Sequence, residues 1–220
     1  KGLGTVGLIT YLRTDSTRVS EEAEKTAREY IQKNYGEEYA GGTTAAKKSD
    51  VKIQDAHEAI RPTDIERIPI EVKESLGRDL LRLYQLIWKR FVASRMTAAK
   101  YETTSVKIDA GNHRFTVATS KILFDGFMSV YTEADEEKAD ENSVLKSIDM
   151  DTRLEFEEFD SKQHFTQPPA HYTEASLVRT LEELGIGRPS TYAPTITTIL
   201  ARRYIVKEAK NLYVTELGDV

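Results

Sequence analysis

The most regular hydrophobic pattern in the chain lies between residues 71 and 99, where apolar residues recur every three or four positions. This spacing predicts a long helix with the apolar stripe as its buried face. The stripe consists of Leu76, Leu80, Leu83, Ile87 and Phe91. Tyr84 and Trp88 lie beside it. Trp88 could stack on a nucleic-acid base, but its place on a sustained apolar face favours a role in the core.

A second helix is predicted over residues 21–31. Ser20 is a good N-cap, acidic residues fill the first turn, and Gly36 is a plausible end. Before this helix, a short apolar run at Val6, Leu8 and Ile9 predicts a buried strand.

Two polar stretches separate these two predicted helices. Residues 37–54 are rich in Gly, Thr, Ala, Lys and Ser, which predicts an exposed loop. Residues 55–63 follow and are dense in titratable groups. Because Pro62 disfavours helical geometry at Arg61, a turn of helix is expected to end there.

At Lys100 the hydrophobic period changes to two. Residues 106–109 and 115–118 alternate around a turn at 110–113, which predicts a hairpin. Residues 124–127 and 154–156 also have strand-like patterns, and the acidic run 133–140 predicts a loop. We expect this β-rich middle to form a separate unit.

The prolines at 168 and 169 mark another boundary. Thr173 can cap a helix that runs to Leu184 and ends at Gly185, and Pro189 suits the first position of a second helix. Two helices around a short Gly-containing turn resemble a helix-turn-helix. The last part of the chain, residues 204–214, predicts a hairpin.

Composition allows one domain or two small ones. The chain has 220 residues, of which 39% are hydrophobic and 30% charged, as is typical of a soluble protein. No apolar run approaches the roughly 18 residues of a membrane span, and no signal peptide is evident. The absence of cysteine excludes disulfides and cysteine-based zinc sites, and it fits a cytosolic protein. Both ends look cut, so we expect a piece of a longer protein.

The net charge of −5 is unevenly distributed. Residues 1–100 carry a net charge of +3, residues 101–168 carry −8, and residues 169–220 are neutral. The acidity is therefore confined to the middle. A surface that contacts phosphates is expected on the two flanks, because polyanion binding depends on local Lys and Arg.

Candidate chemistry gathers where the first apolar run ends. The Tyr11 phenol could act as a nucleophile on a phosphate, and Arg13 could neutralise the phosphate charge. The local residues allow plainer roles as well. Tyr11 could be a half-buried anchor, residues 15–17 a turn or helix cap, and Arg13 the ion-pair partner of Asp15.

Several stretches together resemble type IA DNA topoisomerases, the family that includes bacterial DNA topoisomerase I. They follow one another in the order in which that family has them. They are residues 11–17 (YLRTDST), 57–62 (HEAIRP), 84–94 (YQLIWKRFVAS), 165–170 (FTQPPA), 173–178 (TEASLV) and 185–193 (GIGRPSTYA). Because they span nearly the whole chain, the chain is identified as a member of this family, in the form of a central fragment.

The resemblance implies a mechanism. Tyr11 would attack a phosphodiester of single-stranded DNA, form a 5′-phosphotyrosine and release a 3′-hydroxyl. After strand passage the hydroxyl would attack back, so negative supercoils would relax without ATP. Arg13 would stabilise the charge on the reacting phosphate.

The resemblance also implies DNA-binding residues. His57 and Arg61 would contact phosphates near the cleavage site, and Asp15 and Glu58 would be supporting residues. At a predicted helix N-terminus, Arg188, Ser190 and Thr191 would bind a single strand. The plainer alternatives are a His57 bonded to a backbone carbonyl and a simple helix cap at residues 190 and 191.

The family's other parts are not found in this sequence. Its Mg²⁺ ligands lie in a TOPRIM domain, and many members carry a zinc-ribbon tail. We therefore expect no metal in this fragment, no activity from the fragment alone, and the TOPRIM and remaining domains of the same chain as partners beside single-stranded or negatively supercoiled DNA. The expected location is cytoplasmic and nucleoid-associated, without a membrane partner.

The predicted fold is α+β in three parts. Residues 1–99 would form a small α/β domain with the catalytic tyrosine, 100–168 part of an antiparallel β arch or hinge, and 169–220 part of a helical DNA-binding domain. Two other functions stay open from the residues alone. One is a non-enzymatic single-stranded nucleic-acid binding module, and the other is a structural interaction domain, which would show no salt-dependent DNA binding.

Overall fold

The computed structural model describes residues 6–14, 16–41, 57–132, 152–158 and 160–219. The chain divides into two compact units, residues 1–154 and 155–220. Within the described residues the fold is mixed α and β, with four α-helices and two antiparallel strand pairs. The loops predicted at 42–54 and 133–140 lie outside the described residues.

Helix α1 (Glu21–Tyr35) begins and ends as its sequence predicts. The Ser20 hydroxyl accepts a hydrogen bond from the Ala23 N–H at 3.4 Å, and three glutamates lie in the first turn, near the positive end of the helix dipole. Gly36 follows the last residue, with a positive φ of 116°. The buried residues of α1 are Ala27, Tyr30 and Ile31, which form one face.

Helix α2 (Arg78–Arg95) is shorter than predicted, and its buried face differs from the predicted one. A separate 3-10 turn, Lys73–Ser75, precedes it. The buried residues of α2 are Tyr84, Trp88, Phe91, Val92 and Ala93. Of the predicted apolar stripe, Phe91 is buried, but Leu80 is 61% exposed and Leu83 46% exposed. The predicted core role of Trp88 is confirmed.

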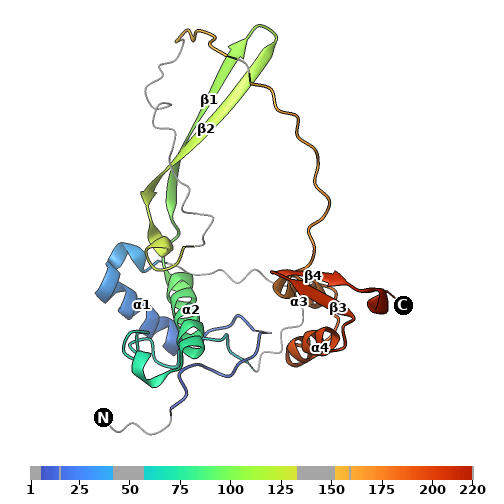
Figure 1. Ribbon diagram of the computed structural model, residues 1–220. Coiled ribbons are helices and arrows are strands. Elements are labelled where there is room, and N and C mark those ends of the chain that lie inside the picture. Colours follow the sequence, from blue (N-terminus) through green and yellow to red (C-terminus); the bar gives the residue numbers. More distant parts are fainter. Residues whose placement is uncertain (1–5, 15, 42–56, 133–151, 159, 220) are drawn as a thin grey trace. The chain divides into compact units, whose positions relative to one another are not determined.

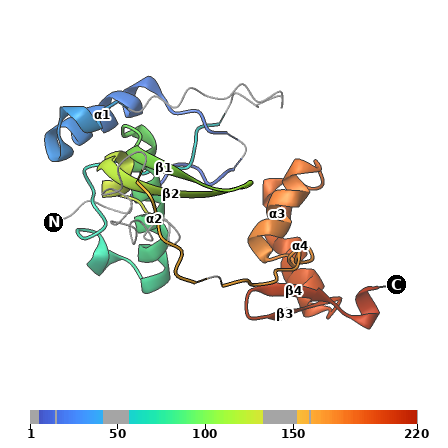
Figure 2. The same ribbon diagram turned by 90° about the horizontal axis from the view of Figure 1, so that it is seen from above.

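Hydrogen bonds explain why the aromatic face of α2 is the buried one. The Trp88 indole N–H donates to the Ile65 carbonyl at 2.9 Å, and the Tyr84 hydroxyl donates to the Arg67 carbonyl at 2.6 Å. Both rings can therefore be buried without leaving a polar atom unpaired. On the α1 side, the Tyr30 and Trp88 rings meet edge to face at 5.8 Å, so α1 and α2 pack together around one core (Figure 1; Figure 2).

Because one face of α2 is buried and the other is exposed, substitutions on the two faces are expected to differ in their effect on the free energy of unfolding. Val92→Ala removes two buried methyl groups and is expected to cost about 1–3 kcal/mol of unfolding free energy, because Val92 is fully buried. Leu80→Ala is expected to change it by less than about 0.5 kcal/mol. Urea unfolding of both variants checks this. A larger loss for Leu80→Ala than for Val92→Ala would contradict the assigned core.

The predicted hairpin is confirmed. Strands β1 (Lys100–Ala110) and β2 (His113–Phe124) pair antiparallel from Lys100↔Phe124 to Ala110↔His113. Gly111 opens the two-residue turn at φ 60°, which suits a hairpin connection that needs a positive φ at its first position. The strand-like patterns after β2 were misleading: residues 126–129 form a 3-10 turn, and residues 152–158 contain no strand.

The base of the hairpin is joined to the helical part of the unit through Tyr39. The Tyr39 hydroxyl donates to Asp125 Oδ1 at 2.7 Å, and its ring lies 4.7 Å from that of Phe124. The backbone also connects here, because Thr97 N–H donates to the Tyr39 carbonyl and Phe127 N–H donates to the Thr97 carbonyl. The hydrogen bond that the Tyr39 hydroxyl donates to Asp125 raises the pKa of this hydroxyl.

The second unit follows the predicted order of helix, helix and hairpin. Helix α3 (Glu174–Glu183) is capped by Thr173, and helix α4 (Pro189–Ala201) has its proline at the first position, as predicted. Strands β3 (Ile205–Glu208) and β4 (Asn211–Val214) form the closing hairpin. A bridge from Thr173 to Asn211 ties this hairpin to the start of α3.

Candidate active site

Two segments that are about fifty residues apart in sequence form the candidate site in the first unit. Ile9 and Pro62 form an isolated antiparallel bridge. It is flanked by hydrogen bonds from Thr10 N–H to the Arg61 carbonyl (2.9 Å) and from Thr63 N–H to the Leu8 carbonyl (3.0 Å). The rest of the site is built on this short ladder.

Two local predictions for these segments were wrong. The apolar run at Val6, Leu8 and Ile9 is a single bridge, with Val6 exposed and the other two half-buried. Residues 57–63 contain no helical turn. The physical reason is the same in both cases. The backbone groups of each segment bond to the other segment, so neither a wider sheet nor a local helix forms.

The structure brings together three residues that the sequence singled out in two separate motifs. The Tyr11 ring stacks on the His57 ring at 6.1 Å, with an angle of 27° between the planes. Arg13 Nη1 lies 3.4 Å from His57 Nε2. Since a guanidinium only donates, Nε2 is the acceptor here, and a neutral His57 carries its proton on Nδ1. Tyr11 is 75% exposed, so its phenol is accessible to a large substrate.

Glu58 and Arg61 form the support behind this group. Arg61 Nη2 lies 2.9 Å from Glu58 Oε2, and the Arg61 side chain is only 15% exposed. The other Glu58 oxygen accepts a hydrogen bond from Ser20 N–H at 2.8 Å, at the start of α1. Arg61 Nη1 also donates to the Pro62 carbonyl. The ion pair between Glu58 and Arg61 is therefore a contact within the fold. Contact between Arg61 and a DNA phosphate stays a prediction.

The environment of Glu58 predicts a loss of stability in acid. Burial raises the pKa of this carboxyl, but the hydrogen bond from Ser20 and the Arg61 guanidinium outweigh burial and lower the pKa below its ordinary value of 4.5. A lowered folded-state pKa stabilises the fold above pH 4.5, and this stabilisation is lost as the pH falls through the folded-state value. Glu58→Gln is expected to flatten that part of the pH dependence of unfolding. Urea titrations at a series of pH values measure this. A free energy of unfolding that depends on acidic pH in Glu58→Gln as it does in the wild type would contradict it.

Sequence reasoning missed Thr10. Its hydroxyl donates to the Ala59 carbonyl at 2.9 Å and accepts from Arg61 N–H at 3.0 Å. A second threonine, Thr63, donates to the Gly7 carbonyl at 2.7 Å. The only signal available in the sequence was the position of Thr10 directly before Tyr11, because nothing local identifies a partner fifty residues away.

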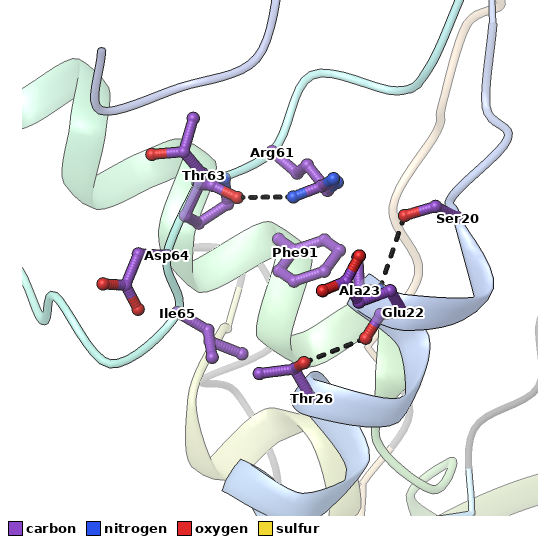
Figure 3. A pocket seen from close by; sticks show the side chains of 10 residues that line it. Ser20, Glu22, Ala23, Thr26, Arg61, Thr63, Asp64, Ile65 and Phe91 are labelled. Carbon is purple, nitrogen blue, oxygen red and sulfur yellow. Dashed lines mark hydrogen bonds between the residues drawn. The ribbon is translucent and has the colours of Figure 1, made fainter. Parts of the chain in front are cut away.

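Two hollows border the paired segments. A cavity of ≈230 Å³ lies between the first two turns of α1, residues 61–65 and Phe91. Figure 3 shows the side chains that line it. A wider groove of ≈850 Å³ lies along α2, where its exposed apolar residues meet the residues that follow Tyr11. Its apolar lining includes Leu12, Leu83, Leu86 and Ile87. Leu83, which the pattern placed in the core, therefore faces this groove.

The remaining predicted site residues do not join this group. Arg188, Ser190 and Thr191 are exposed at the N-terminus of α4 in the second unit. The Thr191 hydroxyl accepts from Arg188 N–H and donates to the Arg188 carbonyl, both at 2.9 Å, so it caps the helix. Asp15, and with it the alternative ion pair to Arg13, lies outside the described residues.

In the described part of the chain, no group of three or more His, Cys, Asp or Glu residues is placed to hold a metal ion. No helix among the same residues is long and apolar enough to cross a membrane.

Comparison with known proteins covers almost the whole chain. A family model described as DNA topoisomerase matches residues 3–220. Among solved structures, full-length topoisomerase I from Thermotoga maritima, in a monoclinic crystal form, is similar with a TM-score of 0.74 and 40% sequence identity. The likeness covers 97% of this chain but 34% of that chain. The present chain thus spans about a third of the length of that protein.

Proposed function

This chain belongs to the DNA topoisomerase family, and on that premise we propose that it supplies the nucleophile and part of the DNA-binding surface of a type IA enzyme. Such an enzyme cleaves one DNA strand, passes a strand through the break and reseals it, which relaxes negative supercoils. The observation that carries the proposal is the exposed Tyr11 phenol stacked on His57, with Arg13 bonded to the same imidazole.

The proposed step conserves atoms and electrons. The Tyr11 oxygen attacks the phosphorus of a phosphodiester and loses its proton, the bond from phosphorus to the 3′-oxygen breaks, and that oxygen leaves as a 3′-hydroxyl after taking up a proton. The free pKa of a phenol is about 10, so the attack needs a cation that stabilises the charge. Arg13 is our candidate, since its guanidinium stays charged and contacts the same His57 on which Tyr11 stacks. Resealing reverses the step, and the phosphotyrosine conserves the bond energy without ATP.

The other predicted residues are proposed to bind the strand. His57 and Arg61 would contact phosphates next to the cleaved one, with Glu58 and Asp15 in support. Arg188, Ser190 and Thr191 would bind DNA at the N-terminus of α4, where all three residues are exposed and the positive end of the helix dipole favours an anion. We also propose three domain roles: residues 1–99 carry the catalytic tyrosine, residues 100–168 form part of a β arch or hinge, and residues 169–220 form part of a DNA-binding domain.

A Mg²⁺ ion is proposed to bind outside this chain. The described residues offer no cluster of metal ligands, so no step of the reaction is assigned to the ion here. The TOPRIM and remaining domains of the longer protein would supply its ligands, and the isolated chain is expected to be inactive. We propose a cytoplasmic, nucleoid-associated location for the whole protein.

The test is to trap the covalent intermediate in the full-length parent. The protein is incubated with Mg²⁺ and a single-stranded oligonucleotide labelled at either its 5′ or its 3′ end, then denatured. We expect only the 3′-end label to stay with the protein, because a 5′-phosphotyrosine retains the downstream fragment. After trypsin digestion, the adduct should lie on the peptide of residues 2–13, which contains Tyr11.

Each other result of this test has a defined meaning. An adduct that retains the 5′-end label would reverse the proposed polarity, and an adduct on another peptide would reassign the nucleophile. Binding without any adduct would favour a non-enzymatic single-strand binding module instead. Binding that does not change with salt concentration would contradict contact with phosphates.

A further inference from the structure

We propose that Thr10 is a positioning residue, whose hydroxyl joins the Tyr11 segment to the His57 segment and thereby holds the phenol in place for attack. The inference rests on the proposed function for its effect on cleavage. The geometric part of the argument is independent of the proposed function, because the hydrogen bonds of Thr10 form whether or not Tyr11 is the nucleophile.

The first step of the argument is the point at which the antiparallel ladder ends. If the ladder continued beyond the Ile9–Pro62 bridge, Arg61 N–H would donate to the Thr10 main-chain carbonyl. It donates instead to the Thr10 hydroxyl at 3.0 Å. The side chain therefore takes the place of the backbone acceptor, and the chain leaves the ladder directly before Tyr11.

The second step is that the hydroxyl is fixed from two sides. It accepts from Arg61 N–H and donates to the Ala59 carbonyl at 2.9 Å, so both its donor and its acceptor functions are used. Threonine is also stiff at χ1 because it is branched at Cβ. Together with the bond from Thr10 N–H to the Arg61 carbonyl, this fixes the peptide that leads into Tyr11.

The third step is that the segment on the other side of these bonds is itself anchored. Ala59 N–H donates to the Arg18 carbonyl at 2.7 Å. Glu58 accepts from Ser20 N–H at the start of α1 and pairs with Arg61. His57 lies directly before Glu58. Thr10 therefore connects Tyr11 to a frame that also places His57.

The fourth step concerns Tyr11 itself. With 75% of its surface exposed, its ring has little packing to hold it, and the stacking on His57 is its one described ring contact. The position of the phenol is thus set mainly by the backbone before it. A displacement of about 1 Å at a reacting group can reduce a rate by about a hundredfold, so a loose Thr10 should slow the chemistry.

Three variants of the full-length enzyme test this. Thr10→Val keeps the shape and removes the hydroxyl, and Thr10→Ser keeps the hydroxyl. The matched control is Thr63→Val, which removes a threonine hydrogen bond of the same kind, to the Gly7 carbonyl, at the end of the ladder away from Tyr11. Single-turnover cleavage of a saturating labelled oligonucleotide with Mg²⁺ gives the rate, and titration in the absence of Mg²⁺ gives the affinity.

We expect Thr10→Val to cleave about ten- to a hundredfold more slowly with its DNA affinity unchanged within about twofold. Thr10→Ser should recover most of the rate, and Thr63→Val should cleave like the wild type. A wild-type rate for Thr10→Val would overturn the proposal. So would an equal loss in Thr63→Val, because the effect would then be one of general stability.

A second readout does not depend on activity. The ring of Tyr11 shifts the resonances of the stacked His57 ring, which can be followed by NMR in histidine-labelled protein and assigned with His57→Gln. We expect this shift to shrink in Thr10→Val and to persist in Thr63→Val, and an unchanged shift in Thr10→Val would contradict the positioning role. If neither the wild type nor any variant forms an adduct, the proposed function fails. The NMR result then still decides whether Thr10 holds the Tyr11 and His57 rings together.

Discussion

Replacement of Tyr11 by phenylalanine is expected to abolish the covalent DNA adduct and to reduce cleavage at least about 10⁴-fold, as for other enzymes that lose a covalent nucleophile. The reason is chemical and not structural. The hydroxyl is the only atom group removed, and the ring is exposed, so the fold loses almost nothing. The measurement is quantification of the 3′-end-labelled protein adduct on denaturing gels, with the full-length enzyme and Mg²⁺.

The control for this variant is Tyr101→Phe. Tyr101 is another exposed tyrosine, on strand β1, and its hydroxyl contacts the Met128 sulfur. It should form the adduct like the wild type. Single-strand binding should survive in both variants, because phenylalanine stacks on bases as tyrosine does. An adduct that persists in Tyr11→Phe would refute the assignment of the nucleophile, whereas a loss in Tyr101→Phe would point to an indirect effect.

Gly126→Ala is expected to be among the most destabilising single changes in the first unit, at about 2–5 kcal/mol. Gly126 has φ 51°, a conformation that costs a residue with a Cβ about 1–2 kcal/mol. A Cβ there would also collide with the Thr97 carbonyl oxygen and with the Ala98 backbone. Overpacking of this kind costs about 1–3 kcal/mol more, and backbone atoms cannot move aside as a flexible side chain can.

The matched control is Gly111→Ala in the tip of the hairpin. Gly111 has a similar φ of 60°, but no atom lies within 4 Å of the position of an added Cβ. It should therefore pay only the conformational cost of about 1–2 kcal/mol. Thermal and urea unfolding of both variants gives the comparison. Equal losses would mean that the close approach of the chain at Thr97 and Ala98 is not maintained in solution.

The predictions that succeeded concern short-range interactions. Ser20, Gly36, Thr173 and Pro189 marked helix ends correctly, because each of them acts on the backbone of the adjoining helix turn. The hairpin around Gly111 was also predictable, since turn geometry depends on the residues in the turn. For the same reason the motif around Tyr11 and the one at residues 185–193 could be found from the sequence alone, and family membership followed from their order along the chain.

The tertiary structure decided which of two apolar faces of α2 is buried. Both faces have helical spacing, but only Tyr84 and Trp88 find carbonyl partners, in the segment around residues 65–67. It also placed His57 beside Tyr11 and Arg13, and it gave Thr10 its partners at Ala59 and Arg61. The sequence by itself determined the caps and the turns, and it singled out the candidate site residues, because these signals depend on neighbours in the chain. The burial of Tyr84 and Trp88 depends on partners 17 and 23 positions away, and the site contacts join residues 44 to 51 positions apart. No local pattern records such partners.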